Sequence, residues 1–367
     1  QYDTQAMLEK FRAAGYEVVP FDAAADVYVI NTCTVTGTGD KKSMQLTRRL
    51  RREHPESHII LAGCLAQRKG AELLETGARL IIGNQHRAQV VELLEQAIRE
   101  DTQIVAVDAL ESVPYERLSI RRHEGHTRAV MKIQEGCDNR CTYCIIPSVR
   151  GPIRSRTLED IRVEAQALSD AGFGELVLTG IHLTSYGRDL ADKPTLADAI
   201  HAVCACEGVN RVRLGSLEPI VANDAFVASV GQLQQLCPQF HLALQSGSDA
   251  VLRRMKRRYN TTQFMAAVER LRAVWPKAAF TTDVIVGFPG ETEEEFQQTL
   301  DFCEKVGFAK IHVFPYSKRE GTPAAEMPDQ IPEPEKEKRV HRLMALESRT
   351  ATAYRESLLG ETRFVLL

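Results

Sequence analysis

The sequence predicts an α/β protein with two successive series of parallel strands and helices. Short apolar runs rich in β-branched residues alternate with amphipathic segments along most of the chain. A stretch with proline and several charges, residues 108–127, interrupts this alternation. Because single hydrophobic cores stop growing near about 250–300 residues, a chain of 367 residues is expected to contain at least two domains.

The N-terminal series predicts a small parallel sheet. Its four strand candidates are residues 27–30, 59–61, 80–82 and 104–107. The segments between them carry apolar residues at helical spacing, as at Val90, Leu94 and Ala97. Each of these helices can therefore bury one stripe against the sheet.

The second series predicts an open barrel of parallel strands. Its six strand candidates, each followed by a loop and a helical pattern, are residues 130–133, 176–179, 212–214, 241–244, 282–286 and 311–314. In such barrels the chemistry lies on the loops at the carboxyl ends of the strands. The prolines of residues 328–334 precede a charged helix over residues 335–358, and the pattern of residues 362–367 predicts a strand that opens another domain.

The composition is that of an ordinary soluble globular protein, with 44% hydrophobic and 26% charged residues. No apolar run reaches the length of about 18 residues that predicts a membrane span, so we expect no membrane segment. Nine cysteines without a disulfide framework favour a reducing cytoplasm. The first residues have neither a signal-peptide pattern nor an initiator Met, so we expect that the natural N-terminus lies further upstream.

The most informative motif is a loop in which Cys137, Cys141 and Cys144 have the spacing C-x3-C-x2-C. Three thiolates on one short loop can bind three irons of a cubane iron-sulfur cluster and leave the fourth iron open. A structural zinc site is the weaker interpretation, because His123 and His126 lie before the loop without the paired spacing of zinc ligands.

Two further cysteines follow strands of the predicted N-terminal sheet. Cys33 and Cys64 each come shortly after an apolar strand candidate. The carboxyl ends of parallel strands lie at one edge of a sheet, where ligand crevices form. The two thiols are therefore expected to converge, and the alternative is that each is a small buried apolar residue.

The cysteine loop resembles that of the radical S-adenosylmethionine (SAM) enzymes, and nearly the whole chain resembles their methylthiotransferase branch. The similar stretches outside the loop are GIHLTSYG at 180–187, GSLEP at 215–219, LQSGSD at 244–249 and DVIVGFPGE at 283–291. Residues 145–156 and 179–183 are most similar to the group that modifies threonylcarbamoyladenosine in tRNA.

The resemblance implies a three-part organisation. It comprises an N-terminal methylthiotransferase α/β domain over 1–115, a partial (β/α)6 radical SAM barrel over 116–355, and the start of a truncated β domain of TRAM-like type for RNA binding over 356–367.

The resemblance also implies the cofactors, which are SAM and two [4Fe-4S] clusters. One cluster would be bound by Cys137, Cys141 and Cys144, whose open iron would chelate SAM. The auxiliary cluster would use Cys33, Cys64 and a third cysteine upstream of Gln1. The residues expected to face the cofactor are Tyr143, Gly180, His182, Ser216, Glu218, Gln245 and Asp283.

Basic residues indicate where RNA is expected to bind. One cluster lies within residues 48–52, and the other candidates are Arg150, Arg154, Arg156, Arg253, Arg254, Lys256, Arg257 and Arg258. Reversal of Arg254 and Arg257 to Glu is expected to weaken tRNA binding while SAM cleavage is retained. An electron donor, flavodoxin-like or equivalent, is the second implied partner.

The expected reaction is transfer of a methylthio group to C2 of N6-threonylcarbamoyladenosine next to the anticodon of tRNA. The first alternative is the same transfer to isopentenyladenosine in tRNA or to an aspartate of a ribosomal protein. The second is a non-enzymatic, metal-stabilised RNA-binding module.

Overall fold

The computed structural model describes residues 1–34, 37–110, 113–121 and 126–366. They form two compact units. The first contains the described residues of Gln1–Glu124 together with Glu135–Asp138 and Cys144–Arg154, and the second contains the rest of the chain. His123, considered above as a zinc ligand, lies outside the described residues. The domain boundary expected near residue 115 stays a prediction.

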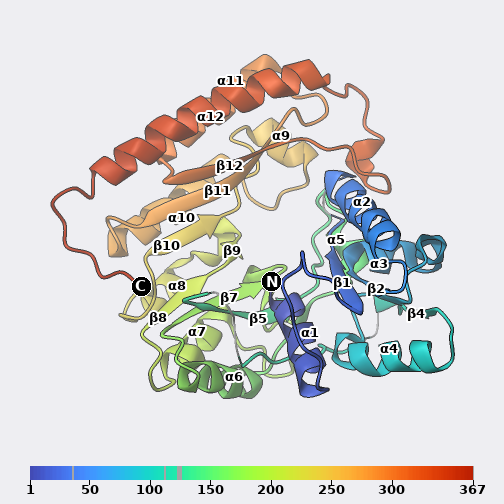
Figure 1. Ribbon diagram of the computed structural model, residues 1–367. Coiled ribbons are helices and arrows are strands. Elements are labelled where there is room, and N and C mark those ends of the chain that lie inside the picture. The colour runs from blue at the N-terminus through green and yellow to red at the C-terminus, as the bar shows by residue number, and fades with distance from the viewer. Residues whose placement is uncertain (35–36, 111–112, 122–125, 367) are drawn as a thin grey trace. The chain divides into compact units, whose positions relative to one another are not determined.

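The first unit is a four-stranded parallel sheet in the order β1-β2-β3-β4 (Figure 1). The strands are β1 (Val27–Thr32), β2 (His58–Gly63), β3 (Leu80–Ile82) and β4 (Ile104–Ala106). The helices are α1 (Tyr2–Ala13), α2 (Gly37–Glu53), α3 (Cys64–Lys69), α4 (Val90–Arg99) and the short α5 (Ile146–Arg150).

Helices cover both faces of this sheet. Leu50 of α2 and Leu65 of α3 pack on the face that carries Ile59 and Leu61. On the opposite face, α1 and α4 pack against Ile60, Ala62, Leu80 and Ile82. The alternation of apolar residues along β2 sends successive side chains to opposite cores, as the sequence predicts.

The second unit is built around two four-stranded sheets, in the orders β6-β5-β7-β8 and β9-β10-β11-β12; β5, β7 and β8 are parallel in the first sheet, and all four strands are parallel in the second. Their strands are β5 (Ala129–Glu135), β6 (Arg154–Ser155), β7 (Glu175–Gly180), β8 (Arg211–Leu214), β9 (Ser216–Leu217), β10 (Gln239–Leu242), β11 (Ala279–Val286) and β12 (Lys310–Pro315). Only Gly215 separates β8 from β9, so one extended segment joins both sheets. The result is the expected open barrel (Figure 1).

The helices of this unit follow the strands in sequence. They are α6 (Leu158–Asp170), α7 (Leu196–Cys204), α8 (Asp224–Val230), α9 (Asp249–Arg254), α10 (Thr261–Val274), α11 (Glu293–Val306) and α12 (Glu333–Glu356). Side chains at the starts of α6, α7, α10 and α11 accept backbone N–H bonds and fix where each helix begins. None of the helices in the described part of the chain is long and apolar enough to cross a membrane.

The strand expected at residues 362–367 is not formed in the described part of that segment. Residues 361–366 have no regular secondary structure, and the ring of Phe364 is 92% exposed. The physical reason is that an isolated strand has no neighbouring backbone with which to pair. The two short strands β6 and β9 were not predicted, because two residues carry no readable period.

Candidate active site

Cys33 and Cys64 lie next to each other in the register of the first sheet. Thr32 of β1 is the register partner of Gly63 of β2, and each cysteine is the next residue. Cys33 is exposed and Cys64 is buried. Neighbouring strands are about 4.8 Å apart, so the two residues are neighbours at the carboxyl edge of the sheet, and the convergence of their thiols on one cluster stays a prediction.

The backbone at Gly63 fixes the direction of Cys64. Gly63 has φ +95° and ψ −152°, a region that essentially only glycine occupies. A Cβ there would lie 2.6 Å from the side chain of Asn31 and 2.7 Å from the carbonyl oxygen of Thr32. The hydroxyl of Thr32 accepts the N–H of Leu65 at 3.1 Å and caps the turn after Cys64.

The sulfur of Cys64 accepts a hydrogen bond from Arg150, which was predicted above to contact RNA. Arg150 Nε donates to Cys64 Sγ at 3.0 Å, and Arg150 Nη1 donates to Glu135 at 3.1 Å and to Asp3 at 3.3 Å. Burial lowers the pKa of the Arg150 guanidinium, but Glu135, Cys64 and Asp3 raise this pKa by more. The group therefore stays charged. The prediction that Arg150 contacts RNA is therefore not supported, because its charge is already paired inside the first unit.

A second buried arginine completes this network and was missed by the sequence analysis. The side chain of Arg87 is 2% exposed and binds Asp3, Glu116 and Glu135. Burial lowers its pKa, and the three carboxylates raise it by more. A lone arginine in a helical segment gives no signal in the sequence, since its partners lie far away along the chain.

The backbone before the cysteine loop is also fixed by glycine. Gly136 has φ +72°, and a Cβ there would overlap the carbonyl oxygen of Pro152 at 1.8 Å. Cys137 N–H donates to the carbonyl oxygen of Gly151 at 3.0 Å. Cys137 and Cys144 are half-buried.

Cys141, on the other hand, packs within the second unit and is 8% exposed. Arg257 Nη1 donates to Cys141 Sγ at 3.1 Å, while Arg257 Nη2 lies 2.7 Å from Glu218 Oε1 and Nε donates to the hydroxyl of Tyr259. RNA contact by Arg257 is not supported, because its side chain is only 7% exposed and faces this site.

Glu218 connects Arg257 to His182 and Asn139. Asn139 Nδ2 donates to Glu218 Oε1 at 3.0 Å and lies 3.2 Å from His182 Nε2. Burial raises the pKa of Glu218, but His182 and Arg257 lower it by more, so the carboxylate is ionised at neutral pH. Glu218 Oε2 is buried and, within the described residues, accepts no hydrogen bond of good geometry, although His182 Nε2 is 3.1 Å away.

Gly180, at the end of β7, lies where β5 and β7 approach each other closely. A Cβ at Gly180 would lie 2.8 Å from Cβ of Gln134 and 3.1 Å from its carbonyl oxygen. Gln134 Oε1 in turn accepts the backbone N–H of His182 at 2.6 Å. The close contacts with Gln134 therefore explain why residue 180 is a glycine. The predicted approach of Gly180 to a cofactor stays a prediction.

The other predicted cofactor residues come from several elements, with Ser216 in β9, Gln245 shortly after β10 and Asp283 within β11. The ring of Tyr143 packs edge-on against Phe288 with centroids 6.5 Å apart. Gln245 has φ +69°, a strained conformation for a residue other than glycine, and its backbone bonds to β11 through Asp283 and Ile285. Ser216 is exposed, and Asp283 lies 3.3 Å from His241.

The remaining basic candidates divide into exposed and internal groups. Arg253, Lys256 and Arg258 are exposed and stay candidates for RNA contact. Arg254 is one-third exposed and binds Glu295 at 2.9 Å.

Two arginines after the cysteine loop also prove to be internal. Arg154 is buried and donates to the carbonyl oxygen of Arg150, and buried Arg156 pairs with Glu164. RNA contact by Arg154 and Arg156 is therefore not supported, because neither guanidinium reaches the surface.

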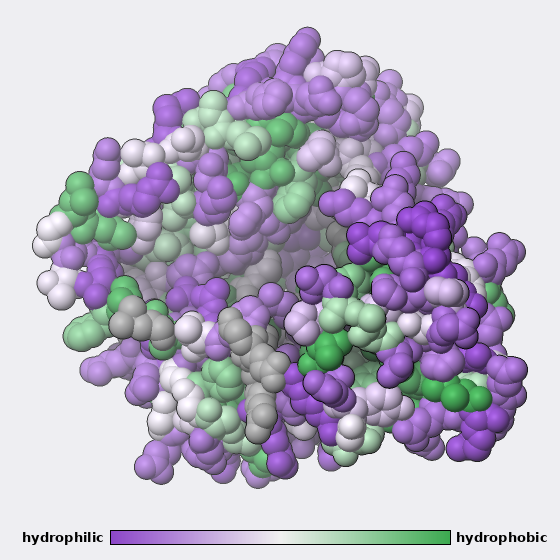
Figure 2. All heavy atoms as spheres, viewed as in Figure 1, coloured by the Kyte–Doolittle hydropathy of each residue, from purple (hydrophilic) through white to green (hydrophobic). Residues whose placement is uncertain are grey.

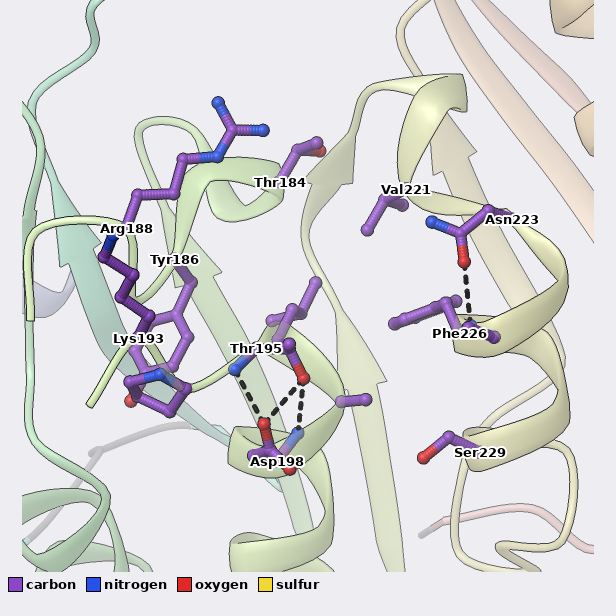
Figure 3. Close-up of a pocket in the computed structure, with 14 residues that line it drawn as sticks. Thr184, Tyr186, Arg188, Lys193, Thr195, Asp198, Val221, Asn223, Phe226 and Ser229 are labelled. Carbon is purple, nitrogen blue, oxygen red and sulfur yellow. Dashed lines mark hydrogen bonds between the residues drawn. The ribbon is translucent and has the colours of Figure 1, made fainter.

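A pocket of about 500 Å³ opens beside the loop after β7, and the sequence analysis missed it. Arg188 and Lys193 lie on one wall, and Asn223, Phe226 and Ser229 lie on the other (Figure 3). The residues that cap α7 and α8 are also on these walls, and their caps are satisfied within each helix.

Comparison with known proteins shows to which class of enzyme the chain belongs. Residues 131–303 match the model of the radical SAM superfamily, and residues 1–83 match that of the uncharacterized protein family UPF0004. The fold is similar to that of TsrM, a radical SAM methyltransferase from Kitasatospora setae, with a TM-score of 0.63 over 88% of this chain and 71% of that chain, at 14% identity. The protein is a radical SAM enzyme.

Relatives give the family. The chain is 44% identical to threonylcarbamoyladenosine tRNA methylthiotransferase MtaB of Bacillus subtilis over 96% of this chain and 79% of the relative. It is 37% identical to the protein of the same name from Thermotoga maritima, over the full length of this chain and 83% of that relative. It is also 38% identical to tRNA-2-methylthio-N(6)-dimethylallyladenosine synthase of Acidothermus cellulolyticus over its full length and 74% of that relative. The chain belongs to the radical SAM methylthiotransferase family.

The residues present fit the cofactors of this family, SAM and [4Fe-4S] clusters. Cys141 and Cys64 each have a guanidinium beside the sulfur, and a positive charge there complements a negatively charged cluster. The orphaned Oε2 of Glu218 is a buried acceptor suited to an amino group or a hydroxyl of SAM. Membership of an enzyme family sets aside the non-enzymatic alternative.

Proposed function

We propose that the protein transfers a methylthio group to C2 of N6-threonylcarbamoyladenosine next to the anticodon of tRNA. The observation that carries the proposal is 44% identity to a protein of that name over 96% of the chain. The motif at residues 180–187 contributes His182 to the site built on Glu218 and Asn139.

In this proposal Cys137, Cys141 and Cys144 bind the first cluster. The cluster and SAM, when bound, supply reductive cleavage of the sulfonium bond. Arg257 orients Cys141 and places a fixed positive charge beside its sulfur. Glu218 accepts from Arg257 and Asn139 through Oε1 and offers Oε2 to the cofactor.

Cys33 and Cys64 are proposed to bind the auxiliary cluster at the carboxyl edge of β1 and β2. Arg150 would neutralise part of its charge through Cys64, and Asp3 and Glu135 keep that guanidinium in place. A third cysteine ligand upstream of Gln1 is part of this proposal.

The partners of the proposed reaction are tRNA and a one-electron donor such as a flavodoxin. Arg253, Lys256 and Arg258 are the exposed candidates for phosphate contact in the second unit. A tRNA substrate and a set of nine free thiols are consistent with action in the cytoplasm.

Mass spectrometry of tRNA nucleosides tests the proposal. Cells that lack the gene should lose the methylthio group from threonylcarbamoyladenosine and keep the unmethylthiolated nucleoside. A plasmid copy should restore it, and a copy with Cys141→Ala should not. Retention of the methylthio group in the deletion strain would overturn the proposed substrate.

A second substrate is supported by one observation, the 38% identity to a dimethylallyladenosine synthase over the full chain. The same nucleoside analysis separates the two, because loss of the methylthio group would then appear on isopentenyladenosine. The ribosomal-protein alternative would leave both nucleosides intact and change the mass of a ribosomal protein.

A further inference from the structure

We infer that the barrel contains a site for a divalent transition-metal ion, formed by His241, Asp283 and His312. Each residue offers one ligand atom, and the three atoms all lie within 4.8 Å of one another. Among the His, Cys, Asp and Glu side chains of the described residues, these three form a group whose possible ligand atoms lie this close together. The site uses none of the five cysteines proposed to bind clusters.

The three ligands come from three adjacent strands and lie on one face of the sheet. His241 is in β10, Asp283 in β11 and His312 in β12, and Asp283 and His312 are register partners. His241 is the register partner of Thr281, two residues before Asp283 and therefore on the same face. Three paired strands form a rigid support, which preorganises the ligand atoms.

The face that carries these ligands is the more exposed face of β11. The alternate residues of this strand, such as Thr282 and Val284, are fully buried, while Asp283 is one-third exposed. His241 is mostly buried and His312 is exposed. An ion bound here is thus reachable and can keep open coordination positions.

The donor set determines the class of ion. Two imidazoles and one carboxylate bind Zn²⁺, Fe²⁺ and Mn²⁺, and leave positions for water or a substrate oxygen. The carboxylate of Asp283 also has room for a cation. Within the described residues, this carboxylate lies 3.3 Å from His241 Nε2, and Lys310 pairs with Glu347 instead.

A second polar group supports the first ligand. The hydroxyl of Thr281 lies 3.0 Å from His241 Nδ1 and also accepts from Gln239 Nε2 at 3.2 Å. A metal-binding histidine is usually held by its other ring nitrogen in this way. This leaves Nε2 of His241 toward Asp283, and the ring of His312 lies 5.9 Å from the ring of His241 between centroids.

The test is titration of the reconstituted holoenzyme with Mn²⁺, in which room-temperature electron paramagnetic resonance counts the free ion. The oxidised [4Fe-4S] clusters are silent in this measurement, and their cysteines are already occupied. We expect one Mn²⁺ per chain that Zn²⁺ displaces. Asp283→Asn and His312→Ala should each weaken binding by at least about tenfold, and Thr281→Val by a smaller factor.

His201→Ala is the matched control, because His201 is an exposed histidine of the same unit that bonds only to Ser229 among the described residues. His312→Ala changes an exposed side chain, so its iron content and circular dichroism should equal those of the wild type. Absence of a stoichiometric Mn²⁺, or equal binding by wild type and both ligand variants, would overturn the inference. Because the readout is ion binding, it does not depend on the substrate proposed above.

Discussion

In each unit an arginine donates a hydrogen bond to the sulfur of a predicted cluster ligand. Arg150 Nε lies 3.0 Å from Cys64 Sγ, and Arg257 Nη1 lies 3.1 Å from Cys141 Sγ. Hydrogen bonds to cysteine sulfurs, together with net charge and solvent exposure, set the potential of an iron-sulfur cluster. If Cys64 and Cys141 bind the clusters as proposed, both arginines are expected to influence the reduction potential through the sulfurs they contact.

The first prediction concerns Arg257. Arg257→Gln removes the positive charge beside Cys141 and the ion pair with Glu218. A positive charge stabilises the reduced, more negative form of a cluster, so its loss should shift the reduction potential to a more negative value. We expect SAM cleavage without tRNA to fall about 10–100-fold. A redox titration followed by electron paramagnetic resonance measures the shift.

The control for Arg257 is the exposed Arg253. Arg253→Gln should leave the reduction potential and SAM cleavage unchanged, because the Arg253 side chain donates only to a backbone carbonyl of its own helix among the described residues. An unchanged potential in Arg257→Gln would contradict the role given to this arginine.

Single residues differ in how far the sequence alone predicts them. The three loop cysteines could be predicted, since their spacing by itself limits the chemistry. Arg257 could not, because five cations in the six residues 253–258 look like one exposed patch. Only the fold shows that Arg257 turns inward while Arg253 and Arg258 stay in solvent.

At the scale of elements, the turn between β2 and α3 sets the position of Cys64. Gly63→Ala should place a methyl group 2.6 Å from the Asn31 side chain and force a backbone conformation that alanine avoids. We expect a loss of more than about 2 kcal/mol in the free energy of unfolding. Iron bound by the auxiliary cluster should fall as well. Urea unfolding and iron analysis measure the two effects.

Gly15→Ala is the control for Gly63→Ala, because it introduces backbone strain without a steric clash. Gly15 ends helix α1 with φ +88°, and a Cβ there meets no atom within 4 Å. This variant should lose about 1 kcal/mol and keep its iron. If both variants lost the same stability and the same iron, the close approach to Asn31 would not be the cause.

The pairing of β7 with β8 gives a pH-dependent prediction. Glu175 of β7 binds Arg211 Nε at 2.7 Å and Arg213 Nε at 2.8 Å, both from β8. Burial raises the pKa of Glu175, but the two arginines lower it by more, so its pKa in the folded protein lies below its ordinary value of 4.5. A carboxylate with a depressed pKa stabilises the fold above its unfolded pKa and loses that contribution as the pH falls through the folded pKa.

Glu175→Gln should therefore lower the free energy of unfolding by about 2 kcal/mol at pH 7, since charge-assisted hydrogen bonds are lost. The difference from wild type should narrow as the pH falls below 4.5. Urea unfolding across this range measures the difference. A gap that widened toward acid would contradict the assignment.

Most strands were predictable from the sequence because each has an apolar pattern of its own. The four strands of the first sheet and six of the second unit lie where the sequence predicts them, with ends that differ by a few residues. The group formed by His241, Asp283 and His312 was not predictable, because its members are 42 and 29 residues apart and meet only through strand pairing.

At the scale of the whole molecule, net charge conceals two basic surfaces. The chain carries a net charge of −3, yet α2 presents exposed Arg48, Arg49 and Arg52 on one face, and hydrophilic side chains gather over this helix in Figure 2. These three residues recur at helical spacing and form one stripe. The second surface is the exposed part of residues 253–258.

The last prediction uses the salt dependence of tRNA binding. Each arginine that contacts a phosphate releases counterions, so log K falls with log salt by about 0.7–0.9 for each contact. The triple variant with Arg48, Arg49 and Arg52 changed to Gln should flatten that slope by about 2–3 units and leave SAM cleavage without tRNA unchanged. The control is Arg162→Gln with Arg349→Gln, two exposed arginines of α6 and α12 that lie near Glu159 and Glu304, just as Arg49 and Arg52 lie near Glu53. Equal slopes for the triple variant and the control would mean that the stripe on α2 does not contact the phosphate backbone.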